Sequence, residues 1–293
     1  MKLRQSERKK AKIKMALQGS AGSGKTYSSL LLAEGLTNGD FSKIAVIDTE
    51  NGSADLYAHL GEYNVITLAP PYTPEIYIKA IEACEKENME VIIIDSISHC
   101  WDELLDFHSK LAGNSFANWA KVTPRQKSFV DKILQCSSHV IATMRTKQDY
   151  VLNQKDGKYI PEKVGLKAVQ RDGLDYEFTL VFDIDIKHFA TSSKDRTGLF
   201  MGKPEFTIST QTGYEIQEWC NKGSSSTDKD SITVQELFLK IQECNSIEEL
   251  LYLYKQYPEH QSTLKASYEQ KKVLLFQLNN PQNLSSNGQF NYN

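Results

Sequence analysis

The chain has 293 residues, of which 40% are hydrophobic and 24% are charged, and its formal net charge is −3 at pH 7. This length and composition allow a full buried core and predict one large domain, or one domain with an appendage. No apolar stretch is as long as a signal-peptide core or a membrane span, so we expect a cytoplasmic protein without membrane contact. The 5 cysteines lack paired spacing, which argues against disulfide and metal sites.

Residues 1–11 form a basic N-terminal segment. Only Glu7 opposes the cations that gather here and continue into the first apolar run, which are Lys2, Arg4, Arg8, Lys9, Lys10, Lys12 and Lys14. Such a segment is either a solvated tail or an arm that binds phosphates, and the sequence leaves both readings open. The small negative net charge therefore does not exclude a nucleic-acid partner.

A phosphate-loop motif follows the first apolar run and precedes a helical pattern. Its residues are Gly19, Ser20, Ala21, Gly22, Ser23, Gly24, Lys25 and Thr26. The glycines let backbone N–H groups converge on phosphates, Lys25 reaches the β and γ phosphates, and the Thr26 hydroxyl is a ligand for Mg²⁺. The motif in this context predicts that the chain binds a nucleoside triphosphate with Mg²⁺.

Apolar β-rich runs alternate with helical patterns from residue 12 to about residue 145, which predicts a mostly parallel sheet flanked by helices. The expected strands cover 13–17, 44–47, 65–68, 91–94 and 139–143, and the expected helices cover 26–36, 74–88, 101–111 and 124–136.

Acidic side chains stand at the ends of two of these strands. Asp95 ends a buried apolar strand, where a carboxylate can hold Mg²⁺ beside the phosphates or merely cap the next helix. Glu50 follows another strand and is our candidate for orienting and polarising the attacking water. Asp48, nearer the strand, fits this role less well but remains an alternative. The other reading of Glu50 is a turn or cap residue.

After residue 145 the pattern becomes antiparallel. Asp156-Gly157 predicts a hairpin turn, and strands over 176–186, 188–191 and 205–208 continue this edge. Cations with interleaved tyrosines suit single-stranded nucleic acid, although a solvated hairpin explains them equally well. The candidate residues are Arg145, Lys147, Tyr150, Lys155, Lys158, Tyr159, Lys163, Lys167 and Arg171.

Two further cations, Lys194 and Arg196, occupy alternate positions of a late hairpin and point the same way. Such a pair can stabilise γ-phosphate charge, in the neighbouring subunit if the hairpin protrudes, or can form a polar hairpin tip.

The remaining chain divides by composition. The nucleotide-binding core is expected over residues 12–222, a flexible linker over 223–230, a small helical module over 231–279 and a disordered tail over 280–293. Within the module, Thr233 with Glu236 and Ser246 with Glu249 have capping-box spacing, and a third helix is expected over 264–278.

Together, the phosphate loop, Ile-Asp-Thr-Glu at 47–50 and Ile-Ile-Ile-Asp-Ser at 92–96 resemble the core of RecA and RadA recombinases. The segments 144–147 and 169–173 resemble phage single-strand annealing ATPases of the fourth Sak class, and Lys194-Asp195-Arg196 resembles the element that KaiC- and DnaB-like proteins insert into the adjacent subunit's nucleotide. The resemblance covers about residues 12–220.

This resemblance implies an α/β, RecA-like ATPase core with an antiparallel edge, which binds ATP, Mg²⁺ and single-stranded DNA as a ring or filament of identical subunits. Thr143 stands where recombinases usually carry a γ-phosphate-sensing Gln, and it is shorter. We expect a phage recombination protein that anneals or pairs single strands in the host cytoplasm. The rivals are a DnaB- or KaiC-like motor, and a nucleotide-switched adaptor whose helical module recruits a single-strand-binding protein or a repressor.

Overall fold

The computed structural model describes residues 10–155, 158–222, 234–257 and 260–279. The chain divides into two compact units, a core unit over Lys10–Gly223 and a helical module within Ser224–Asn293. Residues 1–9 of the basic segment, the expected linker at 223–230, the cap residue Thr233 and the expected tail at 280–293 lie outside the described residues.

The core unit contains an 8-stranded sheet in the order β3-β2-β4-β5-β1-β7-β8, with β6 paired to β5. Six strands form the parallel part, namely β1 (Lys14–Gly19), β2 (Ile44–Asp48), β3 (Asn64–Thr67), β4 (Val91–Asp95), β5 (His139–Lys155) and β7 (Leu180–Ile184). β6 (Lys158–Ala168) and β8 (Ala190–Asp195) are antiparallel to their neighbours. This topology confirms the predicted α/β fold with a mostly parallel sheet and an antiparallel edge.

The expectation for residues 176–186 was wrong in one respect. A 3-10 turn, η3 (Leu174–Tyr176), comes first, and β7 then runs parallel to β1, with Met15 opposite Leu180. β7 fills the edge of β1 that β5 leaves open, so the antiparallel edge begins one strand later, at β8. The expected strand over 205–208 is reduced to an isolated bridge between Ala190 and Phe206.

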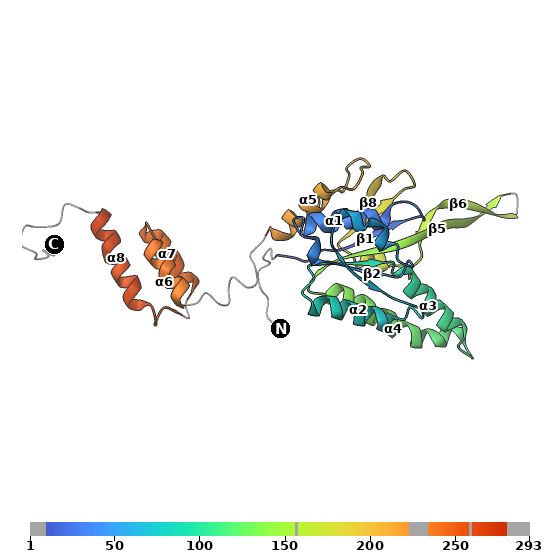
Figure 1. The fold of residues 1–293 in the computed structure, drawn as a ribbon, viewed down its shortest axis with the longest axis horizontal. Helices are drawn as coiled ribbons and strands as arrows, with labels where there is room; N and C mark the ends of the chain where they lie inside the picture. The colour runs from blue at the N-terminus through green and yellow to red at the C-terminus, as the bar shows by residue number, and fades with distance from the viewer. Residues whose placement is uncertain (1–9, 156–157, 223–233, 258–259, 280–293) are drawn as a thin grey trace, which may run out of the picture. The chain divides into compact units, whose positions relative to one another are not determined.

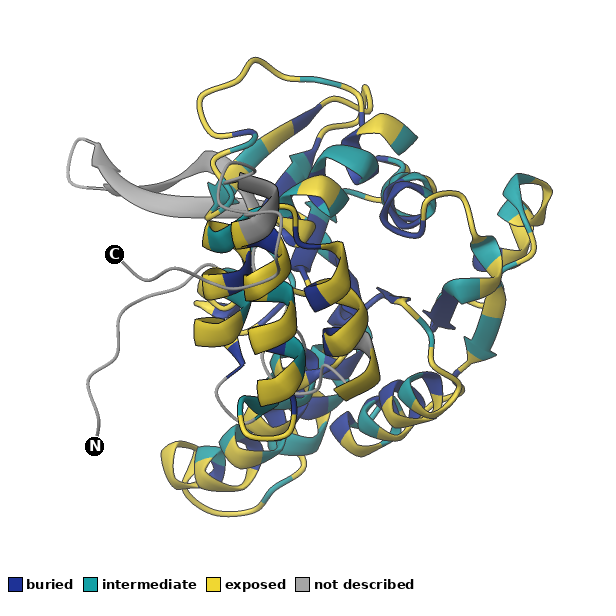
Figure 2. Cartoon of the chain, turned by 90° about the vertical axis from the view of Figure 1, so that its left-hand side faces the viewer, coloured by how far each residue is buried: buried dark blue, intermediate teal, exposed yellow. Residues whose placement is uncertain are grey.

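Helices cover both faces of the sheet (Figure 1). α1 (Lys25–Leu36) and α5 (Thr210–Asn221) pack on one face, and α2 (Pro74–Lys86), α3 (Ser98–Ser109) and α4 (Ser115–Gln135) lie on the other. α1 and α5 approach so closely that a Cβ on Gly35 would lie 2.3 Å from the Thr210 carbonyl oxygen. Buried residues occupy the strands and one side of the helices, whereas the other side of the helices is exposed (Figure 2).

α4 begins earlier than the sequence predicts, because Pro124 lies inside the helix and not at its start. Asn114 caps the true N-terminus, where its Oδ1 accepts from the backbone N–H groups of Phe116 and Ala117 at 2.9 Å and 3.4 Å. The longer helix carries Trp119, which becomes important below.

β5 is 17 residues long and continues past the sheet as a two-stranded ribbon with β6 (Figure 1). The ladder ends with Lys155 opposite Lys158, as a turn at 156–157 requires, although those two residues lie outside the described part. Side chains over 148–166 are likewise outside it, including those of Tyr150, Lys155, Lys158, Tyr159 and Lys163.

The helical module comprises α6 (Val234–Glu243), α7 (Ile247–Gln256) and α8 (Lys265–Asn279), which share a core of their own. Ser246 caps α7, since its Oγ accepts from the Glu249 N–H at 3.1 Å, while the Glu249 carboxylate accepts from the Asn245 N–H at 2.8 Å. Throughout the described residues, no helix is both long and apolar enough to cross a membrane.

Candidate active site

The phosphate loop connects β1 to α1 at the carboxyl end of the parallel strands. Gly22 and Gly24 adopt the left-handed backbone that glycine favours, with φ of 79° and 89°. A Cβ on Gly19 would lie 2.5 Å from the Ile184 carbonyl oxygen, so this position also requires glycine. The loop thereby directs the unpaired N–H groups of the first turn of α1 toward an open cavity of about 490 Å³.

Most of the predicted phosphate-site residues line this cavity. The predicted residues in its lining are Ala21, Gly22, Gly24, Lys25, Thr26, Glu50 and Asp95. The lining also includes Ser53, Tyr57, Arg145 and Thr146. Gly19 and Ser20 contribute carbonyl oxygens, which accept from the Lys25 ammonium at 3.0 Å and 2.8 Å. Ser23 is fully buried beneath the loop. Burial lowers the pKa of Lys25, and a phosphate beside the ammonium would stabilise its charged form.

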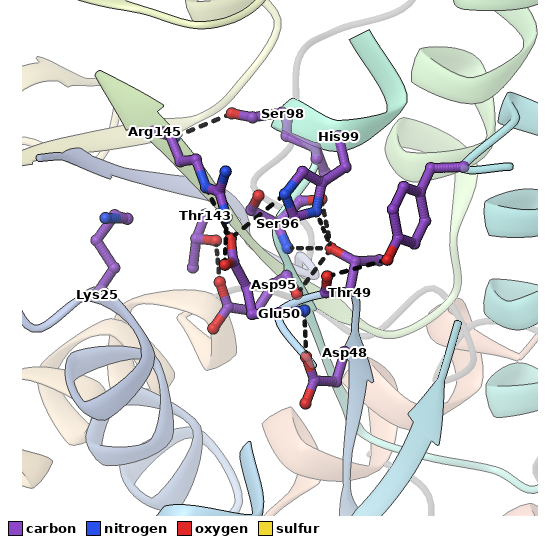
Figure 3. A network of polar contacts seen from close by, with 12 residues as sticks. Lys25, Asp48, Thr49, Glu50, Asp95, Ser96, Ser98, His99, Thr143 and Arg145 are labelled. Carbon is purple, nitrogen blue, oxygen red and sulfur yellow. Dashed lines mark hydrogen bonds and ion pairs between the residues drawn. The ribbon is translucent and has the colours of Figure 1, made fainter. Parts of the chain in front are cut away.

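Asp95 is almost fully buried at the end of β4 and is held by two hydroxyls. Thr143 Oγ1 donates to one carboxylate oxygen at 2.5 Å (Figure 3). Thr26 Oγ1 donates to the other at 2.5 Å. Burial raises the pKa of Asp95, and the two hydroxyl contacts oppose that shift. Thr143 is itself buried and lies behind Asp95, outside the lining of the cavity.

The Thr26 hydroxyl and the Asp95 carboxylate are hard oxygen donors, and this set fits Mg²⁺. Among the described residues no group of three or more His, Cys, Asp or Glu side chains gathers to form a complete metal cage. The remaining ligands would come from phosphate oxygens and water, which is the usual arrangement for Mg²⁺ in a nucleotide site.

Glu50 lies just after β2 and forms a bidentate ion pair with Arg145. Arg145 Nε donates to Glu50 Oε1 at 2.9 Å, and Arg145 Nη2 donates to the other oxygen. Burial favours a raised pKa for Glu50, but the hydrogen bonds and charge of Arg145 outweigh it and lower the pKa. The carboxylate therefore stays ionised while its oxygens are held by the guanidinium.

Asp48 has a different role from Glu50. It is fully buried, and its carboxylate accepts from the backbone N–H groups of Glu50 at 2.6 Å and Ala54 at 3.2 Å. These bonds fix the turn that presents Glu50. The structure therefore favours Glu50 over Asp48 as the acid that faces the nucleotide cavity.

Sequence reasoning missed a polar network behind Glu50. Thr49 Oγ1 contacts His99 Nδ1 at 2.8 Å and accepts from the Ser96 N–H at 2.9 Å (Figure 3). The Tyr72 ring stacks on His99, with 5.1 Å between the ring centroids. Burial and the charge of Arg145 lower the pKa of His99, which favours the neutral ring. The sheet register explains the cluster, because Asp48 pairs with Asp95 and brings both strand ends together.

Arg145 was grouped with the hairpin cations in the sequence, yet its guanidinium lies in the nucleotide cavity. Its backbone N–H donates to Ser98 Oγ at 2.9 Å, which ties the start of the ribbon to α3. A signal was present in the sequence, since Arg145 follows a core strand at the same sheet end as Glu50. The separation of the two residues along the chain concealed their pairing.

Lys194 and Arg196 lie away from this cavity. Lys194 Nζ donates to the Asp175 carbonyl at 3.0 Å and to that of Tyr176, while Arg196 donates to the Tyr176 carbonyl at 3.1 Å. Neither residue lines the nucleotide site of its own chain. By contrast, Lys147, Lys167 and Arg171 line a second cavity at the base of the ribbon.

Comparison with known proteins gives the following relationships. No curated protein matches the chain. A KaiC-like protein from the hyperthermophilic archaeon Pyrococcus horikoshii has a similar solved structure, with 16% sequence identity, a TM-score of 0.41, and coverage of 68% of this chain and 86% of that one. A family model described as AAA domain matches residues 11–216, which contain the phosphate loop, Glu50, Asp95 and Arg145. Because this match spans well over half of the sequence, the chain belongs to the AAA domain family and is a P-loop ATPase.

Proposed function

We propose that this ATPase binds single-stranded DNA as a homo-oligomer and uses ATP to promote annealing or pairing in phage recombination, in the host cytoplasm. One observation carries the proposal. A single strand, β5, bears Thr143 against Asp95, then Arg145 against Glu50, and continues without interruption into the cationic ribbon. A nucleic acid bound to the ribbon would thus contact the same strand whose residues Thr143 and Arg145 bind the Asp95 and Glu50 carboxylates.

In the proposed reaction Glu50 orients and polarises the attacking water, and Lys25 stabilises charge on the transferred phosphoryl group. Thr26 and Asp95 hold Mg²⁺, which would supply charge neutralisation at the β and γ phosphates when bound. Arg145 donates to both Glu50 oxygens and lowers the pKa of the carboxylate, which makes Glu50 a weaker base toward water. Repositioning of Arg145 at the base of the ribbon is therefore the proposed link between DNA and hydrolysis.

The test is the ATPase rate of the full chain alone and with single-stranded DNA, double-stranded DNA and RNA, with anisotropy of a labelled oligonucleotide measured in parallel. We expect binding of single-stranded DNA and faster turnover with it, and a Lys25→Ala control should reduce turnover to background. The proposal fails if no single-stranded DNA binds or if turnover is indifferent to it.

A second candidate, a nucleotide-switched adaptor, is favoured by apolar side chains that the helical module leaves in solvent. Leu251, Tyr252 and Leu274 are 51%, 66% and 50% exposed, a surface that could recruit a single-strand-binding protein or a repressor. This candidate predicts tight ATP binding with turnover unaffected by DNA. The Lys194 and Arg196 pair supports a DNA motor instead, which ATP-driven strand separation would reveal.

A further inference from the structure

A second cavity, of about 550 Å³, lies at the base of the β5–β6 ribbon. Its lining includes Trp101 from α3 and Trp119 from α4. It also includes the cations Lys147 from β5, Lys167 from β6 and Arg171 from the segment after β6. We call these five residues the ribbon groove. Aromatic side chains and cations are thus brought to one hollow from four separate segments of the chain.

The two tryptophans belong to an aromatic stack that is separate from the two hydrophobic clusters around the sheet. The ring of Trp119 lies 4.3 Å from His108 and 6.1 Å from Trp101, with interplanar angles of 25° and 22°. Both tryptophans are only partly buried, and neither belongs to a hydrophobic cluster of the described core. Large, nearly parallel rings beside a cavity are a surface on which a planar ligand can stack.

The charges of the groove favour an anionic ligand. Lys147, Lys167 and Arg171 are exposed, and the acids on the same cavity are Asp102 and Asp172. Lys167 pairs with Asp172 at 2.8 Å across the solvent-exposed rim. Such a pair contributes little and can exchange its carboxylate for a phosphate. Cations and stacked rings in the lining of one cavity suit the phosphates and bases of a single strand.

The groove is joined mechanically to the nucleotide site. Gln170 Nε2, on the groove side, donates to the Ile97 carbonyl at 2.5 Å, just before α3. Ser98, the first residue of α3, accepts from the Arg145 N–H. A ligand in contact with Trp101 would therefore contact α3, whose Ser98 binds the backbone of Arg145. The Arg145 side chain in turn binds Glu50.

We propose that the ribbon groove binds the bases of a single-stranded nucleic acid, with a base stacked on Trp101 and Trp119 and its flanking phosphates on Lys147, Lys167 and Arg171. This inference rests on the proposed function and locates the strand on the protein. It assigns to helices α3 and α4 a role in recognition that the cationic ribbon alone does not supply.

The test uses the tryptophans themselves, of which the chain has 3. The third, Trp219, packs with the core beside α1 on the other face of the sheet. A Trp219→Phe chain therefore reports emission from the groove alone. Titration with oligo-thymidylate should quench that emission over the concentration range in which anisotropy of the same labelled oligonucleotide rises.

Substitution gives the second readout. Trp119→Leu in the full chain should weaken oligonucleotide binding about tenfold or more, the loss typical of one stacked base. Trp119→Phe should retain most of the affinity, and Trp219→Phe should bind as the wild type does. Lys147→Ala should reduce the logarithmic salt slope by about 0.7, whereas the exposed Lys86→Ala, on α2, should leave it unchanged.

The outcomes separate the two proposals. Oligonucleotide binding without quenching, and with unchanged affinity in Trp119→Leu, would overturn the ribbon groove and leave the proposed function standing. An absence of any binding by the wild type would overturn the proposed function. If Trp119→Leu fails to fold by circular dichroism, quenching in the Trp219→Phe chain still decides the question.

Discussion

The ion pair joins Glu50, on the nucleotide cavity, to Arg145, the last β5 residue that pairs with β1 before the ribbon with β6 begins. A carboxylate whose two oxygens both accept from a guanidinium is ionised, but the lowered pKa makes it a weaker base toward water. The pair therefore leads to two separate predictions about hydrolysis, one for a substitution of Glu50 and one for a substitution of Arg145.

Glu50→Gln keeps the size of the side chain and loses the base. We expect near-normal affinity for ATP·Mg²⁺ and turnover lowered by roughly 10² to 10⁴, the range for a general base. Titration of nucleotide binding combined with single-turnover hydrolysis measures the two effects separately. Glu62→Gln, an exposed position away from the cavity, serves as the control. Equal loss of binding and chemistry would make Glu50 a structural residue.

Arg145→Gln removes the charge that lowers the pKa of Glu50 and leaves burial, which raises it. A raised pKa means that the base becomes protonated at higher pH. The acid limb of the kcat/KM profile should therefore move to higher pH in the variant, because that limb reports the free enzyme's base. Lys86→Gln, at an exposed position that does not line the cavity, should leave the profile in place. An unmoved limb in Arg145→Gln would separate the pair from catalysis.

The sequence identified most groups of this site because each lies in a local motif with its own chemistry. The loop from Gly19 to Thr26, Asp95 at a strand end and Glu50 beyond another are local patterns. The partners of these groups were harder to predict. Whether Thr143 would meet a phosphate or Asp95, and whether Arg145 would meet DNA or Glu50, depends on strand order, which residue spacing does not encode.

The contact between α2 and α4 is reinforced by two ion pairs at its edge. Arg125 donates to both Glu75 oxygens at 2.8 Å and 2.7 Å, and Lys132 donates to Glu85 at 2.7 Å. Glu85 also accepts from the Ser137 N–H at 2.8 Å, where α4 leads into β5. These bonds position the helix that carries Trp119.

The pKa of Glu85 gives this contact a pH dependence. Burial would raise it, but Lys132 and the Ser137 N–H lower it from 4.5 to about 2. A lowered folded-state pKa means that the stabilisation is present above pH 4.5 and is lost as the pH falls toward 2. Between these values the unfolding free energy of the wild type should fall more than that of Glu85→Gln, by on the order of 1 to 2 kcal/mol after solvent screening.

Urea unfolding at a series of pH values, followed by circular dichroism, measures that difference. Glu87→Gln, exposed on the cap of α2, should follow the wild type. Parallel curves for wild type and Glu85→Gln would show that the pair does not contribute.

At the level of helices and strands, local patterns predicted which segments would form but not always their limits or directions. β1, the loop and α1 were predictable because an apolar run, a glycine-rich turn and a helical period follow one another. α4 was predicted too short, since proline is common at the first turn of a helix and Pro124 lies well inside this one. The direction of β7 depends on which edge of the sheet is open, a property of the assembled sheet.

Lys194 and Arg196 do not line the nucleotide cavity of the chain to which they belong. This raises the question of whether they act on the nucleotide of a neighbouring subunit. Both bind carbonyl oxygens of η3, at the edge where β7 and β8 end the sheet. A role at the γ-phosphate therefore requires a second copy of the chain. Arg196→Ala should then lower turnover by up to about 10³, and Lys194→Ala by as much or less.

Mixing variants tests that geometry directly. Arg196→Ala subunits keep an intact phosphate loop, and Lys25→Ala subunits keep an intact Arg196, so a mixed assembly contains some interfaces with both. Random equal mixing should restore about a quarter of wild-type turnover when each site is completed by one neighbour. Mixing Lys25→Ala with Glu50→Gln should restore none, because both changes affect the same cavity and every pocket then carries one defect. If Arg196→Ala and Lys25→Ala show no recovery at any ratio, in mixtures shown by native mass spectrometry to assemble together, Arg196 does not act on the neighbouring subunit.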